Sequence, residues 1–327
     1  MTAFFKLIRW QNLLIVAATM VLMRYAIIQP VLENTPVKLY TIAGDASTMM
    51  LQLPLIDFII LVAATVFLTA GGYVINDYFD IKTDLINKGK VLVGTSIPRL
   101  RAMAIHNTLN ILGVAAGFYV SWKAGYFAMG VLFLLVSGLL YFYSATYKRQ
   151  FLIGNIIVAA LTAMVPMLVI LYEAPLLYQY YSVNAIETPS LKGLFLWVGG
   201  FAVFAFLTTL AREIIKDIED FEGDVAYGRN TIPVVAGIVA SKIIAITIII
   251  VTIILLYLVW FLFLNDAISF IYLTAAVEIP LLFVIWQVWT SSGRKQLHSA
   301  SGLMKVIMLT GILYAMLVKV LFIYNIL

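Results

Sequence analysis

Three kinds of residue are scarce or missing in this chain of 327 amino acids. It has no cysteine and only two histidines, His106 and His298, and 11% of its residues are charged. The absence of cysteine excludes disulfides, thiolate metal sites and a cysteine nucleophile. Two histidines are too few for the usual histidine-based zinc sites. The chain also has no G-x-x-x-x-G-K-[ST] sequence, so it lacks the phosphate-binding loop of common ATPases.

Hydrophobic residues are unusually abundant. They form 63% of the chain, and the mean hydropathy is +1.04. A soluble globular domain is about half apolar and roughly a quarter charged. The composition therefore excludes a soluble domain, a disordered chain and a nucleic-acid-binding domain, even though the pI is about 9.2. It indicates an integral membrane protein whose partner is the lipid bilayer, and it gives no sign of a protein partner.

Nine apolar segments are each long enough to cross a bilayer, which takes about 20 residues in a helix. We expect an all-α, polytopic membrane protein that forms a single domain over residues 1–327. The expected spans cover approximately residues 10–29, 54–75, 101–121, 125–144, 151–172, 193–214, 234–264, 267–290 and 301–324.

Lysine and arginine are distributed unequally between the two sides of this nine-span arrangement. The side that holds the N-terminus carries 16 of them and the other side carries 5. Cytoplasmic loops of membrane proteins carry the excess of positive charge. We therefore expect a cytoplasmic N-terminus and a C-terminus on the opposite side, and in a bacterium the membrane would be the inner one.

Two acidic clusters stand at the predicted cytoplasmic ends of the second and sixth spans. The first is Asn76–Asp84 (N-D-x-x-D-x-x-x-D) and the second is Asp217–Asp224 (D-x-x-D-x-x-x-D). Positions i, i+3 and i+7 lie on one face of a helix, so each cluster would bring three carboxylates together. A cation would relieve their repulsion, and oxygen ligands without His or Cys favour Mg²⁺. The alternative is a solvated helix end whose charges are balanced by Lys82 and Lys216.

Basic residues accompany both clusters. Lys88 and Lys90 follow the first cluster, Lys148 and Arg149 follow the fourth span, and Arg229 follows the second cluster. Mg²⁺ in proteins commonly binds a few carboxylates together with substrate phosphates. Two metal-binding stripes with nearby cations, at the end of an apolar bundle, predict a site for a diphosphate with an apolar tail. We expect this site in a central cavity of the bundle that opens near the cytoplasmic face.

With these motifs, the sequence resembles the UbiA superfamily of intramembrane prenyltransferases. The pair of aspartate motifs, their places after the second and sixth spans, and the nine spans match over essentially the whole chain. The segment Arg9–Asn12 is similar to the R-x-x-N opening of the family's first helix. Tyr143–Arg149 departs from the common Y-x-x-x-K spacing and, with Phe151–Asn155, looks more like the digeranylgeranylglyceryl phosphate synthase branch. Lys88–Val91 stands where many members have Arg-Pro.

The resemblance implies transfer of a prenyl group from its diphosphate, with two Mg²⁺ ions joining the diphosphate to both motifs. The implied metal ligands are Asn76, Asp77, Asp80, Asp84, Asp217, Asp220 and Asp224. The expected catalytic residues are Asp77, Asp80, Asp217 and Asp220. The expected substrate-binding residues are Arg9, Asn12, Lys88, Lys90, Tyr143, Lys148 and Arg229. Arg9 could instead serve as a topology anchor, and Tyr143 could instead have a packing role.

Three functions fit these features. The first is transfer of a geranylgeranyl group to a lipophilic acceptor, the hydroxyl of geranylgeranylglycerol phosphate, as in ether-lipid synthesis. The second is an aromatic prenyltransferase of quinone or pigment biosynthesis. The third is a cation transporter with acidic gates. A transporter would carry ionisable residues through the membrane midplane, whereas here only Glu278 lies deep in a predicted span.

Overall fold

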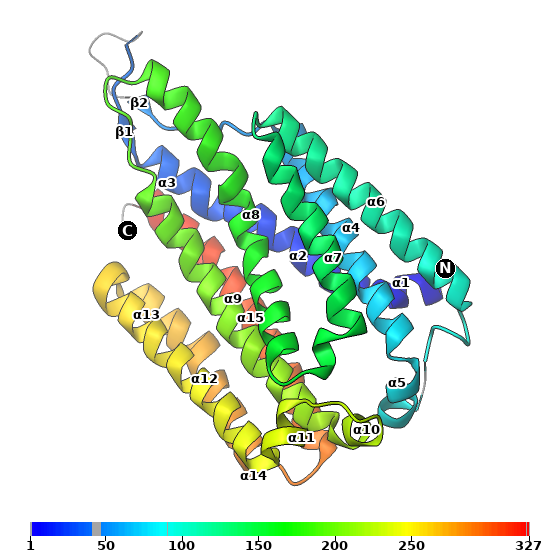
Figure 1. The fold of residues 1–327 in the computed structure, drawn as a ribbon. Coiled ribbons are helices and arrows are strands. Elements are labelled where there is room, and N and C mark those ends of the chain that lie inside the picture. Colours follow the sequence, from blue (N-terminus) through cyan, green and yellow to red (C-terminus); the bar gives the residue numbers. More distant parts are fainter. Residues whose placement is uncertain (1, 41–46, 90, 325, 327) are drawn as a thin grey trace.

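The computed structural model describes residues 2–40, 47–89, 91–324 and 326, and it is almost entirely helical (Figure 1). Within these residues, nine helical segments are long and apolar enough to cross a bilayer, which confirms the predicted number. The segments are Trp10–Glu33, Leu55–Phe79, Arg99–Lys123, Phe127–Arg149, Ile153–Asn184, Lys192–Glu219, Ile238–Leu264, Ala267–Thr290 and Arg294–Ile323.

Some of these segments are single α-helices and others are composites. The single helices are α4 (Leu55–Phe79), α6 (Arg99–Lys123), α8 (Ile153–Asn184), α9 (Lys192–Glu219) and α15 (Arg294–Ile323). The composites contain α2 (Trp10–Leu22), α3 (Gln29–Glu33), α7 (Gly130–Ala145), α12 (Ile238–Val259), α13 (Ala267–Leu273) and α14 (Ile279–Thr290), joined or extended by 3₁₀ and π-helical turns. The short elements are α1 (Thr2–Leu7), α5 (Ile81–Lys88), α10 (Phe221–Ala226), α11 (Ile232–Ala236), β1 (Pro36–Val37) and β2 (Ser47–Thr48).

Most spans differ from the predicted bounds by a few residues, and the fifth, seventh and ninth show the physical reasons or the largest differences. The fifth span continues to Asn184 rather than ending near residue 172, and it passes through two prolines. Membrane helices tolerate proline because neighbouring groups satisfy the freed backbone carbonyls. The seventh begins at Ile238 because Gly237, with φ 87°, separates α12 from the short α11. The ninth begins at Arg294, about two turns before the predicted start.

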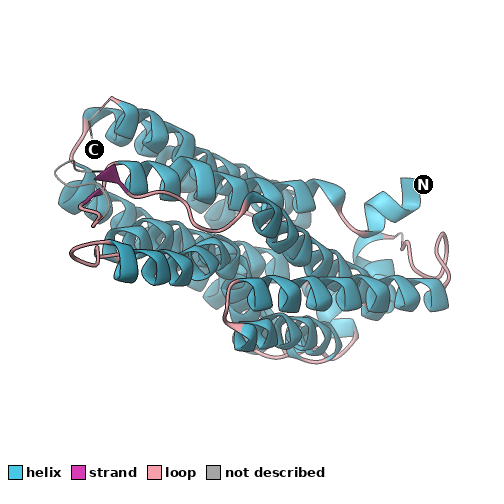
Figure 2. Cartoon of the chain, turned by 90° about the horizontal axis from the view of Figure 1, so that it is seen from above, coloured by secondary structure: helices cyan, strands magenta, loops and turns pink. Residues whose placement is uncertain are grey.

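The helices lie side by side in an elongated bundle (Figures 1 and 2). The short helices α5, α10 and α11 lie at one end, and the two strands lie at the opposite end with the C-terminal end of the chain. Small residues allow close packing: a Cβ on Gly113 of α6 would lie 2.8 Å from Leu68 Cδ2 of α4. Such contacts are typical of helices that pack inside a membrane.

At the strand end, a buried ion pair attaches the connection that precedes α4. Arg24 Nη1 lies 3.6 Å from Glu173 Oε2, and both side chains are almost completely buried. The backbone N–H groups of Gln52 and Leu53 donate to Glu173 Oε1, and Arg24 donates to the carbonyl of Leu53. Buried charges are stable when they are paired and hydrogen-bonded. These contacts therefore attach the connection before α4 to the helices, at the end that lacks the aspartate motifs.

Candidate active site

Both aspartate motifs interrupt the helices that carry them. Helix α4 ends at Phe79 and α9 ends at Glu219, and a short helix follows each end. The residue at each break is the central aspartate, Asp80 (φ −92°, ψ 2°) or Asp220 (φ −94°, ψ 8°). The prediction of three carboxylates on one continuous helix face is therefore wrong, because the chain departs from helical geometry at these aspartates.

The short helices α5 and α10 pack against each other and so join the two motifs. Asn87 Nδ2 of α5 donates to the backbone carbonyl of Asp220 at 3.5 Å. A Cβ on Gly223 of α10 would collide with the side chain of Asn87. A glycine is therefore needed for this close approach, which brings motifs far apart in the sequence to one place.

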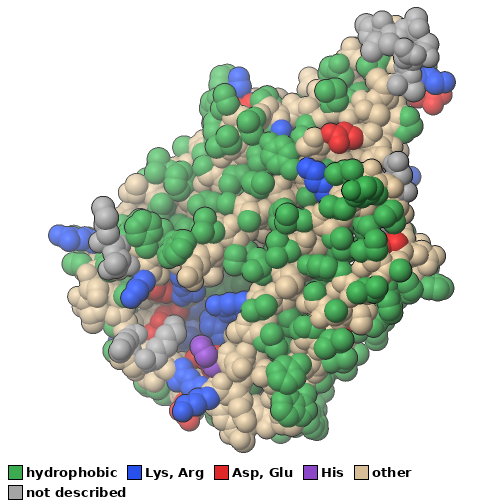
Figure 3. Space-filling model, turned by 180° about the vertical axis from the view of Figure 1, so that it is seen from behind, with side chains coloured by type: hydrophobic (Ala, Val, Ile, Leu, Met, Phe, Trp, Pro, Cys, Tyr) green, Lys and Arg blue, Asp and Glu red, His purple; other side chains and the backbone are tan. Residues whose placement is uncertain are grey.

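Side chains of both motifs line one cavity at this end of the bundle. Figure 3 shows acidic and basic side chains gathered in a hollow there, whereas much of the surrounding surface is hydrophobic. The predicted residues that line the cavity are Arg9, Asn76, Asp80, Asp84, Tyr143, Lys148, Asp217, Asp220, Asp224 and Arg229. The cavity thus unites most of the residues that the sequence singled out.

Asp80 is the centre of the ion pairs in this cavity. Its Oδ1 lies 2.8 Å from Lys148 Nζ and 2.6 Å from Arg229 Nη2. Lys148 also donates to Asn76 Oδ1 at 3.1 Å. Burial alone would raise the pKa of Asp80, but the charges of Lys148 and Arg229 lower this pKa to about 2. Asp80 is therefore held in its ionised state by the two predicted substrate-binding cations.

Asp224 in the second motif has a different environment. Its Oδ1 lies 3.3 Å from Arg229 Nη1, and Thr231 Oγ1 donates to its Oδ2 at 3.1 Å. Burial raises the pKa of Asp224 to about 6, although Arg229 and the hydrogen bond from Thr231 act in the opposite direction. Arg229 bridges the two motifs because one guanidinium contacts both Asp80 and Asp224.

The N-terminal segment contacts the first motif through Arg9. Arg9 Nη2 lies 2.8 Å from Asp77 Oδ1, and its guanidinium lies over the ring of Tyr73 at 4.8 Å. Arg9 has left-handed backbone angles (φ 52°, ψ 53°) at the start of α2. Asn12 donates to the hydroxyl of Tyr73 at 3.2 Å. Arg9 is thus part of the charged site, and a role as topology anchor alone does not account for its contacts.

Asn155 is a site residue that the sequence analysis did not select. Its Nδ2 donates to Asp217 Oδ2 at 2.7 Å from the first turn of α8. The preceding Gly154 allows the backbone to pass close to Lys148, because a Cβ there would lie 2.7 Å from Lys148 Cα. The available signal was an amide side chain in the first turn of an otherwise apolar span, directly after the basic pair Lys148–Arg149.

Five other polar residues that line the cavity were also missed. They are Thr83, Asn87, Glu213, Lys216 and Thr231. The first three lie three or four residues from a motif aspartate, which places them on the same helical surface. From the sequence, Lys216 was expected only as a local charge partner of the second cluster. Lys90 lies outside the described residues, and the side chain of Lys88 is not described either, so both stay predictions.

The donor chemistry of the cavity fits Mg²⁺. Its candidate ligands are carboxylate and amide oxygens, which hard cations prefer. In the described part of the chain, no three His, Cys, Asp or Glu side chains are grouped closely enough to hold a metal ion. Mg²⁺ commonly takes one or two carboxylates and completes its shell with water and substrate phosphates. The residues therefore fit an ion that binds together with its substrate.

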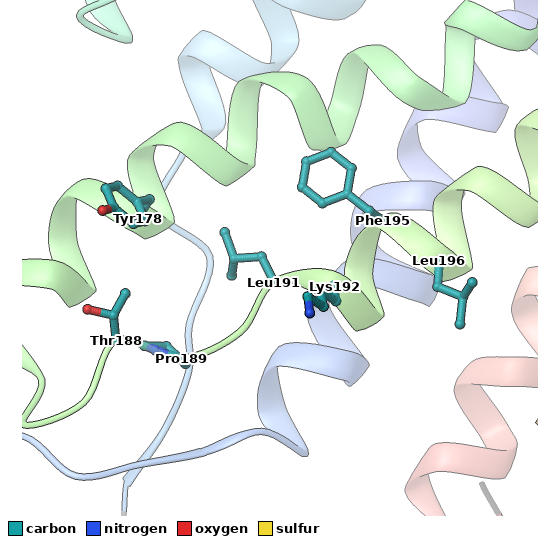
Figure 4. A pocket seen from close by; sticks show the side chains of 7 residues that line it. All are labelled: Tyr178, Thr188, Pro189, Leu191, Lys192, Phe195 and Leu196. Carbon is teal, nitrogen blue, oxygen red and sulfur yellow. The ribbon is translucent and has the colours of Figure 1, made fainter.

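A second, shallow groove lies at the opposite end of the bundle, between the end of α8 and the start of α9 (Figure 4). Its lining residues are Tyr178, Thr188, Pro189, Leu191, Lys192, Phe195 and Leu196. With one charged side chain among seven, this groove offers no ligand set for a metal or a diphosphate. The acidic cavity is therefore the candidate active site.

The fold and the site define an integral, multi-pass membrane protein with a charged cavity at one end of its helix bundle. The model of the UbiA prenyltransferase family matches residues 39–324. The chain belongs to this family, which confirms the resemblance seen in its aspartate motifs.

Individual relatives agree with this assignment. The chain is 34% identical over 193 residues to a digeranylgeranylglyceryl phosphate synthase from Thermococcus sibiricus, and the match spans 58% of this chain and 61% of that protein. The match to the structure of a UbiA homologue from Aeropyrum pernix K1 spans 92% of this chain and 98% of that chain, with TM-score 0.61 and 16% identity. The match to the structure of a UbiA homologue from Archaeoglobus fulgidus, bound to GPP and Mg²⁺, spans 96% of this chain and 99% of that chain, with TM-score 0.53 and 17% identity. These two structures are similar to this chain in fold.

Proposed function

We propose that this protein is a Mg²⁺-dependent intramembrane prenyltransferase that takes a geranylgeranyl group from its diphosphate. The observation that carries the proposal is the meeting of both aspartate motifs with Lys148 and Arg229 around one cavity. Because the cavity lies at the end of an apolar bundle, the diphosphate and its apolar tail would each contact a suitable surface. The name of the Thermococcus sibiricus relative and the ligands of the Archaeoglobus fulgidus homologue support this substrate class.

The roles of the motif residues follow from their chemistry. The proposed ligands of two Mg²⁺ ions are Asn76, Asp77, Asp80, Asp84, Asp217, Asp220 and Asp224. Bound Mg²⁺ would supply Lewis-acid stabilisation of the negative charge on the departing diphosphate. Lys148 and Arg229 both contact Asp80 here and are the proposed diphosphate contacts. Arginine offers a bidentate fork to phosphate and lysine a point charge, so the two contribute differently.

The proposed acceptor is the hydroxyl of geranylgeranylglyceryl phosphate. The bond between prenyl carbon 1 and the diphosphate oxygen breaks, and the acceptor oxygen forms an ether bond to that carbon. The hydroxyl proton passes to the departing diphosphate. The positive charge that develops on the allylic group must be kept from water, and an apolar bundle provides this protection. Tyr143, which lines the cavity, is the proposed aromatic contact for this charge.

The proposal also includes the arrangement in the membrane. The whole chain would act as one domain, with the charged cavity at the cytoplasmic face and opening into the centre of the bundle. The distribution of lysine and arginine supports this orientation. The prenyl diphosphate would then enter from the cytoplasmic side, and the lipid acceptor would enter from the bilayer.

Purified protein supplied with radiolabelled geranylgeranyl diphosphate and Mg²⁺ tests the proposal directly. The acceptors are geranylgeranylglyceryl phosphate and 4-hydroxybenzoate. We expect an ether product from the first and its loss when EDTA removes the metal. Prenylation of 4-hydroxybenzoate alone would identify an aromatic prenyltransferase. Absence of Mg²⁺-dependent diphosphate release with both acceptors would contradict an enzyme and favour the transporter hypothesis.

Variants of the central aspartates test the assigned site. Asp80→Asn and Asp220→Asn keep the side-chain shape but remove one negative charge from each motif. Loss of a metal ligand is expected to lower turnover at least about 100-fold, because metal stabilisation of a transition state is worth several kcal/mol. Glu187→Ala is the matched control, since Glu187 is an exposed acid at the opposite end of the bundle. Turnover above about a tenth of wild type in either variant would overturn the assignment.

A further inference from the structure

A group of basic side chains lies beside the candidate diphosphate site and has no role in the mechanism above. Arg212 and Lys216 belong to α9 and Lys305 belongs to α15, two helices that pack against each other. The charge of Lys305 interacts with the charges of Arg212 and Lys216, so the three side chains form one electrostatic group. We call Arg212, Lys216 and Lys305 the basic cluster.

Two members of the basic cluster lie well inside their spans. Arg212 precedes the end of α9 by seven residues, and Lys305 follows the start of α15 by eleven. At a rise of 1.5 Å per residue, these positions are about 10 Å and about 16 Å from the helix ends. Ionisable residues at such depth are unfavourable in a membrane and usually mark a functional site. Topology anchors belong at the helix end, where Arg294 and Lys295 already lie.

One carboxylate, Glu213, neutralises part of this positive charge. Glu213 interacts electrostatically with all three members of the basic cluster and with Arg9, and it is hydrogen-bonded to Arg212 Nη1. Arg9 is in turn shared with Asp77. Lys216 is also shared with the motif aspartate Asp220. Lys305 interacts with three cations, Arg212, Arg9 and Lys216, and with Glu213, so the region around it is positive and attracts an anion.

The geometry of the basic cluster also indicates that it receives a ligand. Arg212 Nε is buried and has no hydrogen-bond partner in the described part of the chain. Buried polar atoms are nearly always satisfied, and a bound ion or a water molecule is one of the usual partners of a donor that has none in the protein. Lys216 lines the same cavity as the aspartate motifs, and Lys305 is exposed at the surface of the bundle. The basic cluster therefore extends from the reaction site to the outside of the bundle.

We infer that the basic cluster binds the phosphate group of a phosphorylated lipid acceptor. The inference rests on the proposed prenyl transfer and assigns the residues that hold the phosphate of its acceptor. The donor's diphosphate is assigned to Lys148 and Arg229, so a second anion needs cations of its own. Arginine and lysine at this position would hold the acceptor phosphate while its hydroxyl reaches the prenyl group.

The test uses Lys305→Gln in the full-length enzyme, with geranylgeranylglyceryl phosphate and its phosphate-free alcohol as acceptors. We expect the KM for the phosphate acceptor to rise about tenfold, as for loss of one hydrogen bond to a charged group. The KM for geranylgeranyl diphosphate and turnover of the phosphate-free alcohol should stay within about twofold, since neither uses this phosphate contact. Lys305→Arg should restore the acceptor KM. Lys319→Gln, on the same helix toward its other end, is the matched control.

The outcomes separate this inference from the proposed function. An active enzyme whose acceptor KM is unchanged in Lys305→Gln would overturn the role of the basic cluster and leave prenyl transfer intact. An equal rise in both KM values, without rescue by Lys305→Arg, would assign Lys305 a structural role and also overturn the inference. A wild-type protein that transfers no prenyl group to either acceptor would refute the proposed function and the inference with it.

Discussion

Asp80 and Asp224 are identical side chains in one cavity, yet their surroundings move their pKa values in opposite directions. Burial raises both values, but for Asp80 the two adjacent cations prevail and give a pKa of about 2. For Asp224 burial prevails and gives about 6. Asp80 is therefore ionised at any physiological pH, whereas Asp224 gains a proton in mild acid. Neighbouring acids with separated pKa values are typical of functional sites.

The first prediction concerns the pH dependence of metal use. Since a metal ligand must lose its proton, the Mg²⁺ concentration for half-maximal turnover should rise below pH 6, by up to about tenfold per pH unit. Thr231→Val removes a hydrogen bond that lowers the pKa of Asp224. In this variant the Mg²⁺ concentration for half-maximal turnover should therefore begin to rise at a higher pH than in the wild type. Mg²⁺ titrations of turnover at a series of pH values measure this shift. The same pH dependence of the Mg²⁺ requirement in the variant and the wild type would contradict the role of Asp224.

The same proton has the opposite effect on stability. The pKa of Asp224 is about 6 in the folded protein, against a reference value of 3.8. The folded state therefore binds this proton more tightly than the unfolded chain does. Asp224 therefore adds most to the free energy of unfolding below pH 3.8. This contribution declines as the pH rises from 3.8 to about 6. Metal binding and stability should thus follow opposite trends over this range.

At the scale of elements, interruptions and close contacts place the charged side chains. The breaks at Asp80 and Asp220 allow α5 and α10 to meet across the end of the bundle. The start of α8 approaches the segment that carries Lys148, where Gly154 leaves room for the backbone. This contact supports Lys148 in its position against Asp80, 2.8 Å away.

Gly154→Ala tests the contact between α8 and the segment of Lys148. The new Cβ would lie 2.7 Å from Lys148 Cα, and since neither atom belongs to a flexible side chain, the backbone must move. We expect a fall in turnover of about tenfold and a loss of stability of about 1–3 kcal/mol, as for other overpacked sites. Activity and thermal unfolding measure the two effects.

A second glycine provides the control for this prediction. A Cβ on Gly199 of α9 would meet no atom within 4 Å among the described residues. Gly199→Ala should leave turnover unchanged and raise stability by up to about 1 kcal/mol, because alanine is the better helix former. Equal behaviour of the two variants would show that the close approach at Gly154 has no functional effect.

At the scale of the whole molecule, the charged groups at the two ends of the bundle have different roles. One end collects the aspartate motifs, the cations that contact them and Lys216 of the basic cluster around the cavity. Near the other end, the buried pair of Arg24 and Glu173 attaches the connection that precedes α4. Membrane helices are apolar along their length, so charged groups gather where helices end or face one another.

Cysteine labelling tests the predicted orientation in the membrane. The chain has no natural cysteine, so a single introduced cysteine gives an unambiguous signal. Tyr227→Cys, exposed at the charged end, should react with a membrane-impermeant reagent only from the cytoplasm. Ile186→Cys, exposed at the strand end, should react only from the opposite side. The reverse pattern would invert the orientation, and reaction of both from one side would contradict the nine-span arrangement.

The amino-acid sequence by itself determined the elements and most of the chemistry of the site. Hydrophobic length is a local property, so the nine apolar runs correspond to nine long helical segments in the described part of the chain. The two aspartate motifs could be located from the sequence because the same spacing of aspartates repeats at the ends of two spans. Arg9, Lys148 and Arg229 could be selected from their residue type and their place near the predicted cytoplasmic ends.

Only the tertiary structure decided how these residues combine. The contact of Arg229 with both Asp80 and Asp224 depends on the packing of α5 against α10. Asn155 joins Asp217 because α8 begins beside the end of α9. The basic cluster exists because α9 and α15 pack together and bring Lys305 near Arg212. Periodicity reports which face of a helix is polar, but the partner of that face depends on how distant helices cross.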